Sequence, residues 1–222
     1  MTLDGPAGSG KSTVARQLAL RLGMEFLDTG AMYRGLAARC LDEGIDPADR
    51  PDLVIELAQL SPMRFNWATD PPRLTVGGLD VTDRLRDLEV TAAVSDVAAI
   101  GGVRCVLVDR QRQIGADHPR LVTEGRDQGS VVFPDAFAKF YLDASPQVRA
   151  ARRAAQLREA GKPADEASIL AGILRRDHKD SHRSDGPLIC PADALRIDTS
   201  DMTLAQVIDF VEQRVRDRTA AP

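Results

Sequence analysis

A glycine-rich run near the start of the chain carries the most specific chemical signal. It reads Gly-Pro-Ala-Gly-Ser-Gly-Lys-Ser and matches the phosphate-loop pattern G-x-x-x-x-G-K-[ST], between a strand-like and a helix-like segment. Glycines let backbone N–H groups surround phosphate oxygens, Lys11 places a charge on the β- and γ-phosphates, and Ser12 can bind Mg²⁺. The run predicts a loop that holds a nucleoside triphosphate. The residues expected to contact it are Gly5, Pro6, Ala7, Gly8, Ser9, Gly10, Lys11, Ser12 and Thr13.

A group of arginines follows in the second half of the chain. Arg149, Arg152 and Arg153 stand at i, i+3 and i+4 of a predicted helix, so they share one face. Adjacent guanidinium groups repel one another unless they meet anions. We expect this face to close over ATP phosphates, with a solvated surface as the alternative.

The next predicted helix carries a second one-sided group, because Arg176, Asp180 and Arg183 are at i, i+4 and i+7. A salt-bridge ladder within the helix is the alternative to an anion site. From Arg149 through Arg183 nine Lys and Arg stand against five Asp and Glu, although the formal charge of the whole chain is −4. This concentration of positive charge, together with the break at residues 160–163, predicts a hinged lid.

Glu124-Gly125-Arg126-Asp127 directly follows a predicted buried strand, at the carboxyl end where open α/β sheets bind ligands. Arg126 can hold a phosphate, and the two acids can reach Mg²⁺ through water or accept hydrogen bonds from a base. Asp28 ends an earlier strand and can orient the water around the metal, or can serve simply as an acid at a helix start. The alternative interpretation of residues 124–127 is an ordinary turn without a role in binding.

The phosphate loop alone does not separate kinases from GTPases, motor ATPases or regulatory nucleotide binders. A GTPase would be expected to carry a base-reading Asn-Lys-x-Asp motif, and the sequence has none. The short chain and the basic lid favour a kinase for a small substrate.

The composition of the 222 residues is that of an ordinary globular protein, with 43% hydrophobic and 28% charged residues. The net negative charge argues against a general nucleic-acid binder. Cys40, Cys105 and Cys190 lack metal-ligand spacing, and we expect reduced thiols. No apolar stretch is long enough for a membrane span and no signal peptide is evident, so the sequence predicts a cytoplasmic protein.

The pattern along the chain alternates strands and helices, with one interruption. Between Met63 and Val81 short alternating segments predict antiparallel strands, which indicates an insertion. Only four residues precede the loop, so its strand is predicted to be stunted or to begin upstream. Helices are predicted at 11–22, 29–43, 51–60, 87–114 (interrupted at Gly101-Gly102), 146–159 and 165–182, with a last apolar stripe from Leu204 to Val215, and further strands at 24–28, 121–123, 137–142 and 195–197.

Several segments together resemble the bacterial type of cytidylate kinase over essentially the whole chain. They are residues 4–13, residues 27–34 (Leu-Asp-Thr-Gly-Ala-Met-Tyr-Arg), residues 124–129, residues 131–136, and Arg176-Asp177 with Asp180, Arg183, Pro187 and Leu188. Thr29 stands where many members have Ser, and Glu124 where some have Asp. Lys179 and Ser181 fall where some relatives have further arginines.

The resemblance implies an α/β nucleoside monophosphate kinase fold, with a central parallel sheet flanked by helices. It implies one domain over 1–222, with a core at about 1–43, 118–148 and 190–222, an enlarged monophosphate-binding insert at about 44–117, and a lid at about 149–189. By position, Thr29, Ser95, Arg104 and Asp127 would contact cytosine or its surroundings. Arg34, Arg126 and Arg183 would hold the CMP phosphate, and Arg176 with Asp180 would reach the ribose. Ser95 and Arg104 are chosen by the resemblance alone.

The expected reaction is transfer of the ATP γ-phosphoryl group to CMP, with dCMP as a second acceptor implied by the family. Lys11, Arg126, Arg153 and Arg183 are expected to stabilise the transfer, with Arg149 and Arg152 on ATP. Mg²⁺ would bind Ser12 directly and Asp28 and Glu124 through water. We expect a monomer without nucleic-acid or membrane partners, active in pyrimidine nucleotide metabolism. The alternatives are another small P-loop kinase, such as one for shikimate or dephospho-coenzyme A, and a P-loop regulatory ATPase.

Overall fold

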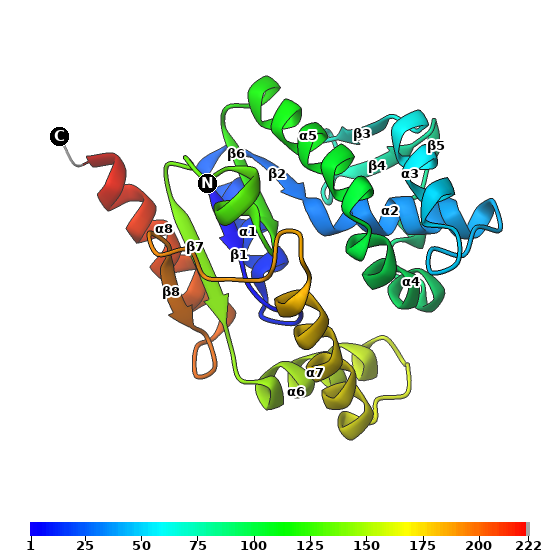
Figure 1. The fold of residues 1–222 in the computed structure, drawn as a ribbon. Coiled ribbons are helices and arrows are strands. Elements are labelled where there is room, and N and C mark those ends of the chain that lie inside the picture. Colours follow the sequence, from blue (N-terminus) through cyan, green and yellow to red (C-terminus); the bar gives the residue numbers. More distant parts are fainter. Residues whose placement is uncertain (221–222) are drawn as a thin grey trace. The chain divides into compact units, whose positions relative to one another are not determined.

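The computed structural model describes residues 1–220, with side chains through residue 219. The chain divides into two compact units (Figure 1). The first unit is formed by Met1–Met24 and Val122–Pro222, and the second by Glu25–Leu121.

The central sheet is parallel and has the strand order β2-β6-β1-β7-β8. β1 is parallel to β6 and β7, and the register places Asp4 of β1 opposite Gly125 of β6. Leu3, Val122 and Leu142 are completely buried, as expected for strands that are covered on both faces. The strands are β1 (Thr2–Asp4), β2 (Glu25–Asp28), β6 (Leu121–Gly125), β7 (Lys139–Asp143) and β8 (Leu195–Asp198). The predicted α/β class is confirmed.

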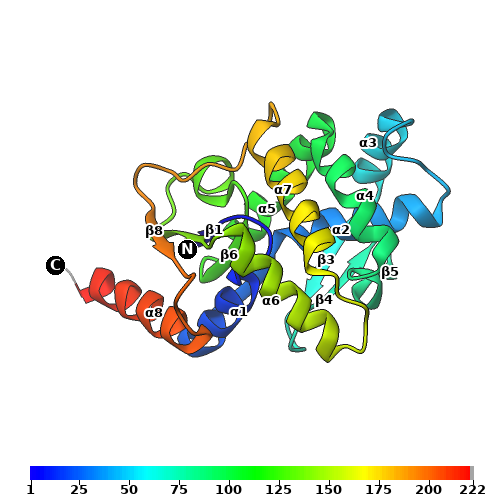
Figure 2. The same ribbon diagram turned by 90° about the horizontal axis from the view of Figure 1, so that it is seen from below.

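The described residues of the first unit form four α-helices. They are α1 (Lys11–Leu22), α6 (Pro146–Glu159), α7 (Glu166–His182) and α8 (Leu204–Ala220), and a short π-helical turn, η2 (Gln128–Val132), follows β6. α6 packs along α7, and α1 packs against α8 (Figure 2). Ser145 caps α6 by accepting from the N–H of Val148, and Asp165 caps α7 through the N–H of Ser168.

The second unit combines helices with a small antiparallel sheet of order β3-β4-β5. Burial alternates along β4, where Leu74 and Val76 face a cluster with Ala31 and Val81. The antiparallel strands predicted from the alternating pattern are confirmed. Its other elements and strand bounds are α2 (Thr29–Asp42), α3 (Pro51–Leu60), β3 (Met63–Asn66), β4 (Arg73–Val76), β5 (Leu79–Asp80), η1 (Thr82–Arg84), α4 (Leu88–Ala99) and α5 (Gly101–Asp117).

The break between α4 and α5 lies one residue earlier than predicted. Ile100 leaves the helical conformation, and Gly101 and Gly102 begin α5. A Cβ atom at Gly102 would lie 2.6 Å from Cδ1 of Ile55 on α3. The glycine therefore permits close packing of α5 on α3 and does not make the turn.

Within residues 1–220 no single helix has both the length and the apolarity needed to cross a membrane. α4 and α5 meet the criterion only when taken together, and they are bent by 95° at their junction.

Candidate active site

The phosphate loop connects β1 to α1, and two of its polar side chains, Lys11 and Ser12, meet Glu124 at the end of the neighbouring strand β6. Ser12 Oγ donates to Glu124 Oε1 at 2.6 Å, and Lys11 Nζ lies 3.7 Å from Glu124 Oε2. Lys11 Nζ also donates to the carbonyl oxygen of Pro6 at 3.2 Å. Lys11 and Glu124 are both buried. The lysine charge is thus held inside the loop by a carboxylate, close to the helix N-terminus.

The hydroxyl of Ser12 and the carboxylate of Glu124 suit Mg²⁺, which prefers oxygen ligands and keeps several waters. Among residues 1–220 no group of three or more His, Cys, Asp and Glu side chains could hold a metal by itself. The residues present therefore fit an ion that is held mainly by nucleotide phosphates and water.

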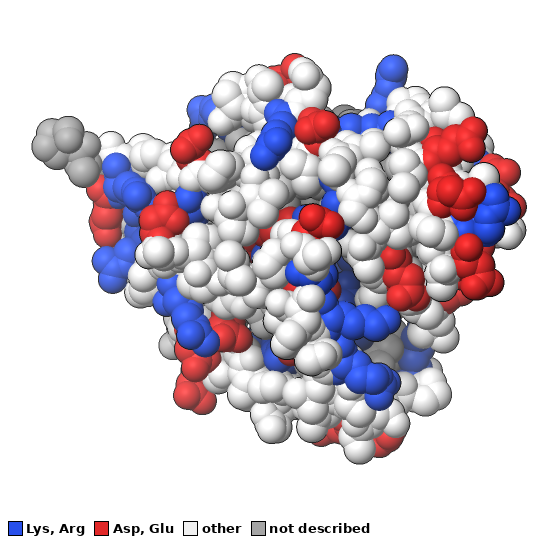
Figure 3. All heavy atoms as spheres, viewed as in Figure 1, with Lys and Arg blue, Asp and Glu red and all other residues white. Residues whose placement is uncertain are grey.

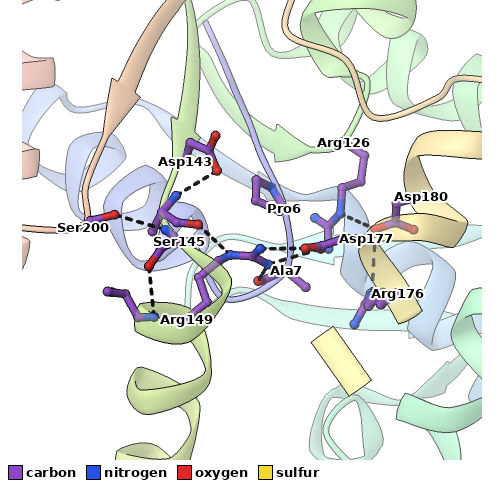
Figure 4. A network of polar contacts seen from close by, with 12 residues as sticks. Pro6, Ala7, Arg126, Asp143, Ser145, Arg149, Arg176, Asp177, Asp180 and Ser200 are labelled. Atoms are coloured by element: carbon purple, nitrogen blue, oxygen red, sulfur yellow. Dashed lines mark hydrogen bonds and ion pairs between the residues drawn. The ribbon is translucent and has the colours of Figure 1, made fainter. Parts of the chain in front are cut away.

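A cluster of acids and arginines lies beyond the end of β6. Arg126 Nε donates to Asp180 Oδ2 at 2.8 Å, and Arg176 Nε lies 3.9 Å from the same oxygen (Figure 4). Arg183 Nη2 lies 3.8 Å from Asp127 Oδ2. The structure thus brings together five predicted acceptor residues from the β6 loop, α7 and the residue after α7.

The charges of this cluster support one another. Burial raises the pKa of Asp180, but Arg126, Arg176 and Arg183 outweigh it and hold the pKa below its usual range. Burial lowers the pKa of Arg126, but Asp180, Glu124 and Asp177 keep it above its ordinary value. Arg126 therefore stays charged, and among the five clustered residues three arginines stand against two aspartates.

Arg149 of α6 points inward and connects three segments of the first unit (Figure 4). Its Nη1 donates to the carbonyl oxygen of Ala7 at 3.0 Å, and its Nε to that of Ala144 at 2.9 Å. Its guanidinium also forms a forked pair with the two carboxylate oxygens of Asp177, at 3.2 and 2.6 Å. Arg149 thus contacts the backbone of the phosphate loop itself.

The other two arginines of α6 lie differently. Arg152 donates to the hydroxyl of Thr199 at 3.1 Å and to its carbonyl oxygen. Arg153 is exposed and contacts Gln156 of its own helix at 3.4 Å.

Lys and Arg side chains gather around α7 on the face shown in Figure 3.

In the second unit, Asp28 and Arg34 form a pair at the start of α2. Asp28 Oδ1 accepts from the N–H of Ala31 at 2.7 Å, and Oδ2 accepts from Arg34 Nη2 at 2.8 Å. Asp28 is therefore a helix cap that also orients Arg34. Thr29, the first residue of α2, is buried.

Ser95 and Arg104 lie on α4 and α5, which pack against each other and against α2 within this unit. Arg104 is buried, and its Nη1 donates to the hydroxyl of Tyr33 at 3.3 Å. Ser95 is partly buried. The four predicted acceptor residues of the second unit thus lie on three mutually packed helices.

Sequence reasoning missed three residues next to these side chains, namely Asp4, Tyr33 and Asp177. Asp4 is 1% exposed and accepts hydrogen bonds from the N–H groups of Gln128 and Gly129. An acid at the end of a short, fully buried strand was the available signal. Tyr33 and Asp177 lie inside the segments that carry the resemblance, but no spacing rule distinguishes them.

Comparison with known proteins identifies relatives that match the chain over nearly its full length. The family model described as "Cytidylate kinase" matches residues 1–217. The chain belongs to the cytidylate kinase family. A cytidylate kinase of Mycobacterium avium is 47% identical over 219 residues, which are 99% of this chain and 96% of that protein. One of Azotobacter vinelandii is 41% identical, with 100% and 96% covered.

Cytidylate kinases use ATP as a phosphoryl donor, so family membership makes the chain a kinase, a transferase enzyme. Among solved structures, an uncharacterized protein from Eubacterium ventriosum has a TM-score of 0.53 at 11% identity, with 99% of this chain and 98% of that chain covered. At that identity the similarity concerns the fold alone.

Proposed function

We propose that the chain transfers the γ-phosphoryl group of ATP to CMP, giving ADP and CDP, and that dCMP is a second acceptor. Full-length similarity to cytidylate kinases carries this proposal. The geometry of the first unit supports it, because β1 and β6 are parallel neighbours. The phosphate loop and the Glu124–Asp127 block therefore begin side by side, at the carboxyl ends of these two strands. A donor phosphate on one loop thereby comes close to an acceptor on the other.

The donor is held by the phosphate loop, residues 5–13. Lys11 places its charge on the β- and γ-phosphates, and Arg149 fixes the backbone at Ala7. Mg²⁺ would be held by the Ser12 hydroxyl, with Glu124 and Asp28 acting through water, and it neutralises developing phosphate charge when bound. Arg152 and Arg153 of α6 are proposed to reach ATP phosphates. In this proposal they exchange their contacts with Thr199 and Gln156 for phosphate oxygens when ATP binds.

Asp127 is proposed to read the base. Cytosine presents an exocyclic amino donor where uracil presents an acceptor oxygen, so a carboxylate accepts from the first and repels the second. Asp127 is buried, and its Oδ2 lies 3.8 Å from Arg183 Nη2. A site of this kind can discriminate by about 10⁴-fold, whereas shape alone gives far less. Thr29, Ser95 and Arg104 complete the proposed contacts around the base.

The acceptor phosphate is proposed to bind Arg34, Arg126 and Arg183, with Arg176 and Asp180 on the ribose. A phosphate oxygen is ionised near neutral pH, so the attack requires no general base. What the side chains supply is position and positive charge. Arg126 is suited to this role because Asp180 fixes its Nε and keeps the side chain ionised.

For the surroundings of the reaction, we propose a monomer that acts in the cytoplasm in pyrimidine nucleotide metabolism, without nucleic-acid or membrane partners. The segments 149–189 and 44–117 are proposed to act as the lid and as the monophosphate-binding insert. Closure of the lid would exclude water and limit wasteful hydrolysis of ATP.

The experiment that tests the function is a coupled assay of ADP formation with ATP and Mg²⁺ and, in turn, CMP, dCMP, UMP, AMP and shikimate. We expect the highest kcat/KM with CMP or dCMP and a much lower value with UMP. Higher activity on AMP or shikimate would contradict the proposal and favour another small-molecule kinase. ATP turnover that ignores every acceptor and needs a protein partner would favour a regulatory ATPase.

A further inference from the structure

The turn that follows Asp127 is capped from another strand. η2 begins at Gln128, and its first two N–H groups have no partners within the turn. Asp4 supplies both: Oδ1 accepts from Gln128 N at 2.9 Å and Oδ2 from Gly129 N at 2.7 Å. Asp4 is 1% exposed, so both bonds are shielded from water.

Asp127 occupies the N-cap position of η2, yet its own side chain makes no capping hydrogen bond. The backbone carbonyl oxygen of Asp127 accepts from the N–H groups of Val131 and Val132, at 2.9 and 3.1 Å, which ties its main chain to the turn. Because Asp4 provides the cap, the Asp127 carboxylate is directed elsewhere, and its Oδ2 lies 3.8 Å from Arg183.

η2 packs closely against β1 and β7 at Gly129. A Cβ atom at Gly129 would lie 3.0 Å from Oγ1 of Thr2, 3.2 Å from Cδ of Lys139 and 3.3 Å from Oδ2 of Asp4. Gln128 is also fixed, since its Oε1 accepts from the hydroxyl of Thr123 at 2.8 Å. A shift of the turn away from Asp4 would therefore move the backbone of Asp127 with it.

We propose that Asp4 is a positioning residue for acceptor selection, which holds the Asp127 carboxylate in place through the backbone of Gln128 and Gly129. The inference rests on the proposed function, in which Asp127 reads cytosine. Asp4 is the last residue of β1 before the phosphate loop. Its side chain therefore connects the strand that leads into the ATP-binding loop with η2, the turn that follows Asp127.

The charge on Asp4 is costly to bury, which supports a role beyond packing. Burial, together with the nearby charge of Asp127, raises the pKa of Asp4 to about 6, although the two backbone hydrogen bonds and Lys11 act to lower it. An apolar or amide side chain would avoid this cost, but neither offers two acceptor oxygens for the two N–H groups.

The test compares Asp4→Asn with the control Thr2→Val, and uses kcat and KM for CMP, UMP and ATP. Thr2 is buried on the same strand, and its hydroxyl makes no hydrogen bond within the described structure.

In Asp4→Asn the new amide NH₂ places a donor against one backbone N–H, and losing one such bond costs ~1–3 kcal/mol, or about tenfold or more in an equilibrium. We therefore expect the KM for CMP to rise and the preference for CMP over UMP to fall, each about tenfold, with the KM for ATP within about threefold of wild type. Thr2→Val should match wild type.

An unchanged CMP-over-UMP preference in Asp4→Asn would overturn the inference, as would an equal rise in the KM for ATP, which would mark Asp4 as a support of the phosphate loop. If Asp4→Asn does not fold, Gly129→Ala serves instead. Its added methyl pushes the turn away from Asp4 and Thr2, so selectivity for CMP should again fall while the KM for ATP holds. If the wild-type protein does not turn over CMP, the proposed function itself is wrong. That outcome is read from the wild type alone and is therefore distinct from any result obtained with the variants.

Discussion

Arg126 donates a hydrogen bond from Nε to Oδ2 of Asp180 at 2.8 Å, and so joins the loop after β6 to α7. Both side chains are largely buried, and Arg176 approaches the same oxygen. One carboxylate therefore serves two arginines. This arrangement fixes the guanidinium of Arg126 before any acceptor arrives, and preorganised charge of this kind lowers the cost of binding a phosphate.

Asp180→Asn should therefore weaken acceptor binding. Charged hydrogen bonds contribute ~1.5–3 kcal/mol, so we expect the KM for CMP to rise at least about tenfold while the KM for ATP changes little. Asp185→Asn is the matched control, because Asp185 is exposed and its carboxylate accepts a hydrogen bond from the hydroxyl of Ser184 at 3.3 Å. A KM for CMP that is equal in the two variants would contradict the role assigned to Asp180.

Asp127→Ala should abolish the preference for cytosine while ATP binding survives. Removal of the carboxylate takes away the acceptor for the amino group and the repulsion of uracil, so the kcat/KM ratio of CMP to UMP should fall towards 1. The check is that ratio together with the affinity for a non-hydrolysable ATP analogue. A parallel loss of CMP turnover and analogue binding would identify Asp127 as a structural residue.

Arg149→Met should destabilise the protein far more than Arg196→Met. Both arginines form ion pairs at 2.6 Å, with Asp177 and Asp143 respectively, but Arg149 is 3% exposed and Arg196 66%. Breaking a buried pair leaves an uncompensated charge and costs ~3 kcal/mol, whereas an exposed pair contributes less than ~1 kcal/mol. Urea denaturation measures the difference. Equal losses in the two variants would show that Arg149 does not hold α6, α7 and the phosphate loop together.

Stability should depend on pH through Asp4. Because the folded state raises the pKa of Asp4 from 3.8 to about 6, the folded chain holds this proton more tightly than the unfolded chain. The stabilisation is fully present below the unfolded value and is lost as the pH rises through about 6. Relative to Asp4→Asn, which cannot titrate, wild type should lose roughly 1 kcal/mol of unfolding free energy between pH 5 and pH 8. Thr2→Val should show no such change relative to wild type, and a pH-independent difference for Asp4→Asn would contradict the expected titration.

Features that depend on neighbours in the sequence were predictable. The bounds 11–22 and 146–159 agree with α1 and α6. The signals are local: Gly23 follows the first helix, and Ser145-Pro146 starts the second. The antiparallel insert was predictable for the same reason, since alternation and turn residues lie within one short segment.

Features set by distant partners were not predictable. The π-helical turn η2 depends on Asp4, which is 124 residues before Gln128. The inward direction of Arg149 depends on Ala7 and Asp177, and helical spacing alone placed it on a face with Arg152 and Arg153. Spacing identifies which residues share a face, but the fold decides what that face meets.

The central claim is tested most directly by ³¹P NMR of the wild-type chain with ATP, Mg²⁺ and equal concentrations of CMP and UMP. We predict that CDP and ADP signals grow in equal amounts and that UDP forms only after most CMP is consumed. Formation of ADP with free phosphate and no CDP, or equal formation of CDP and UDP, would contradict the account.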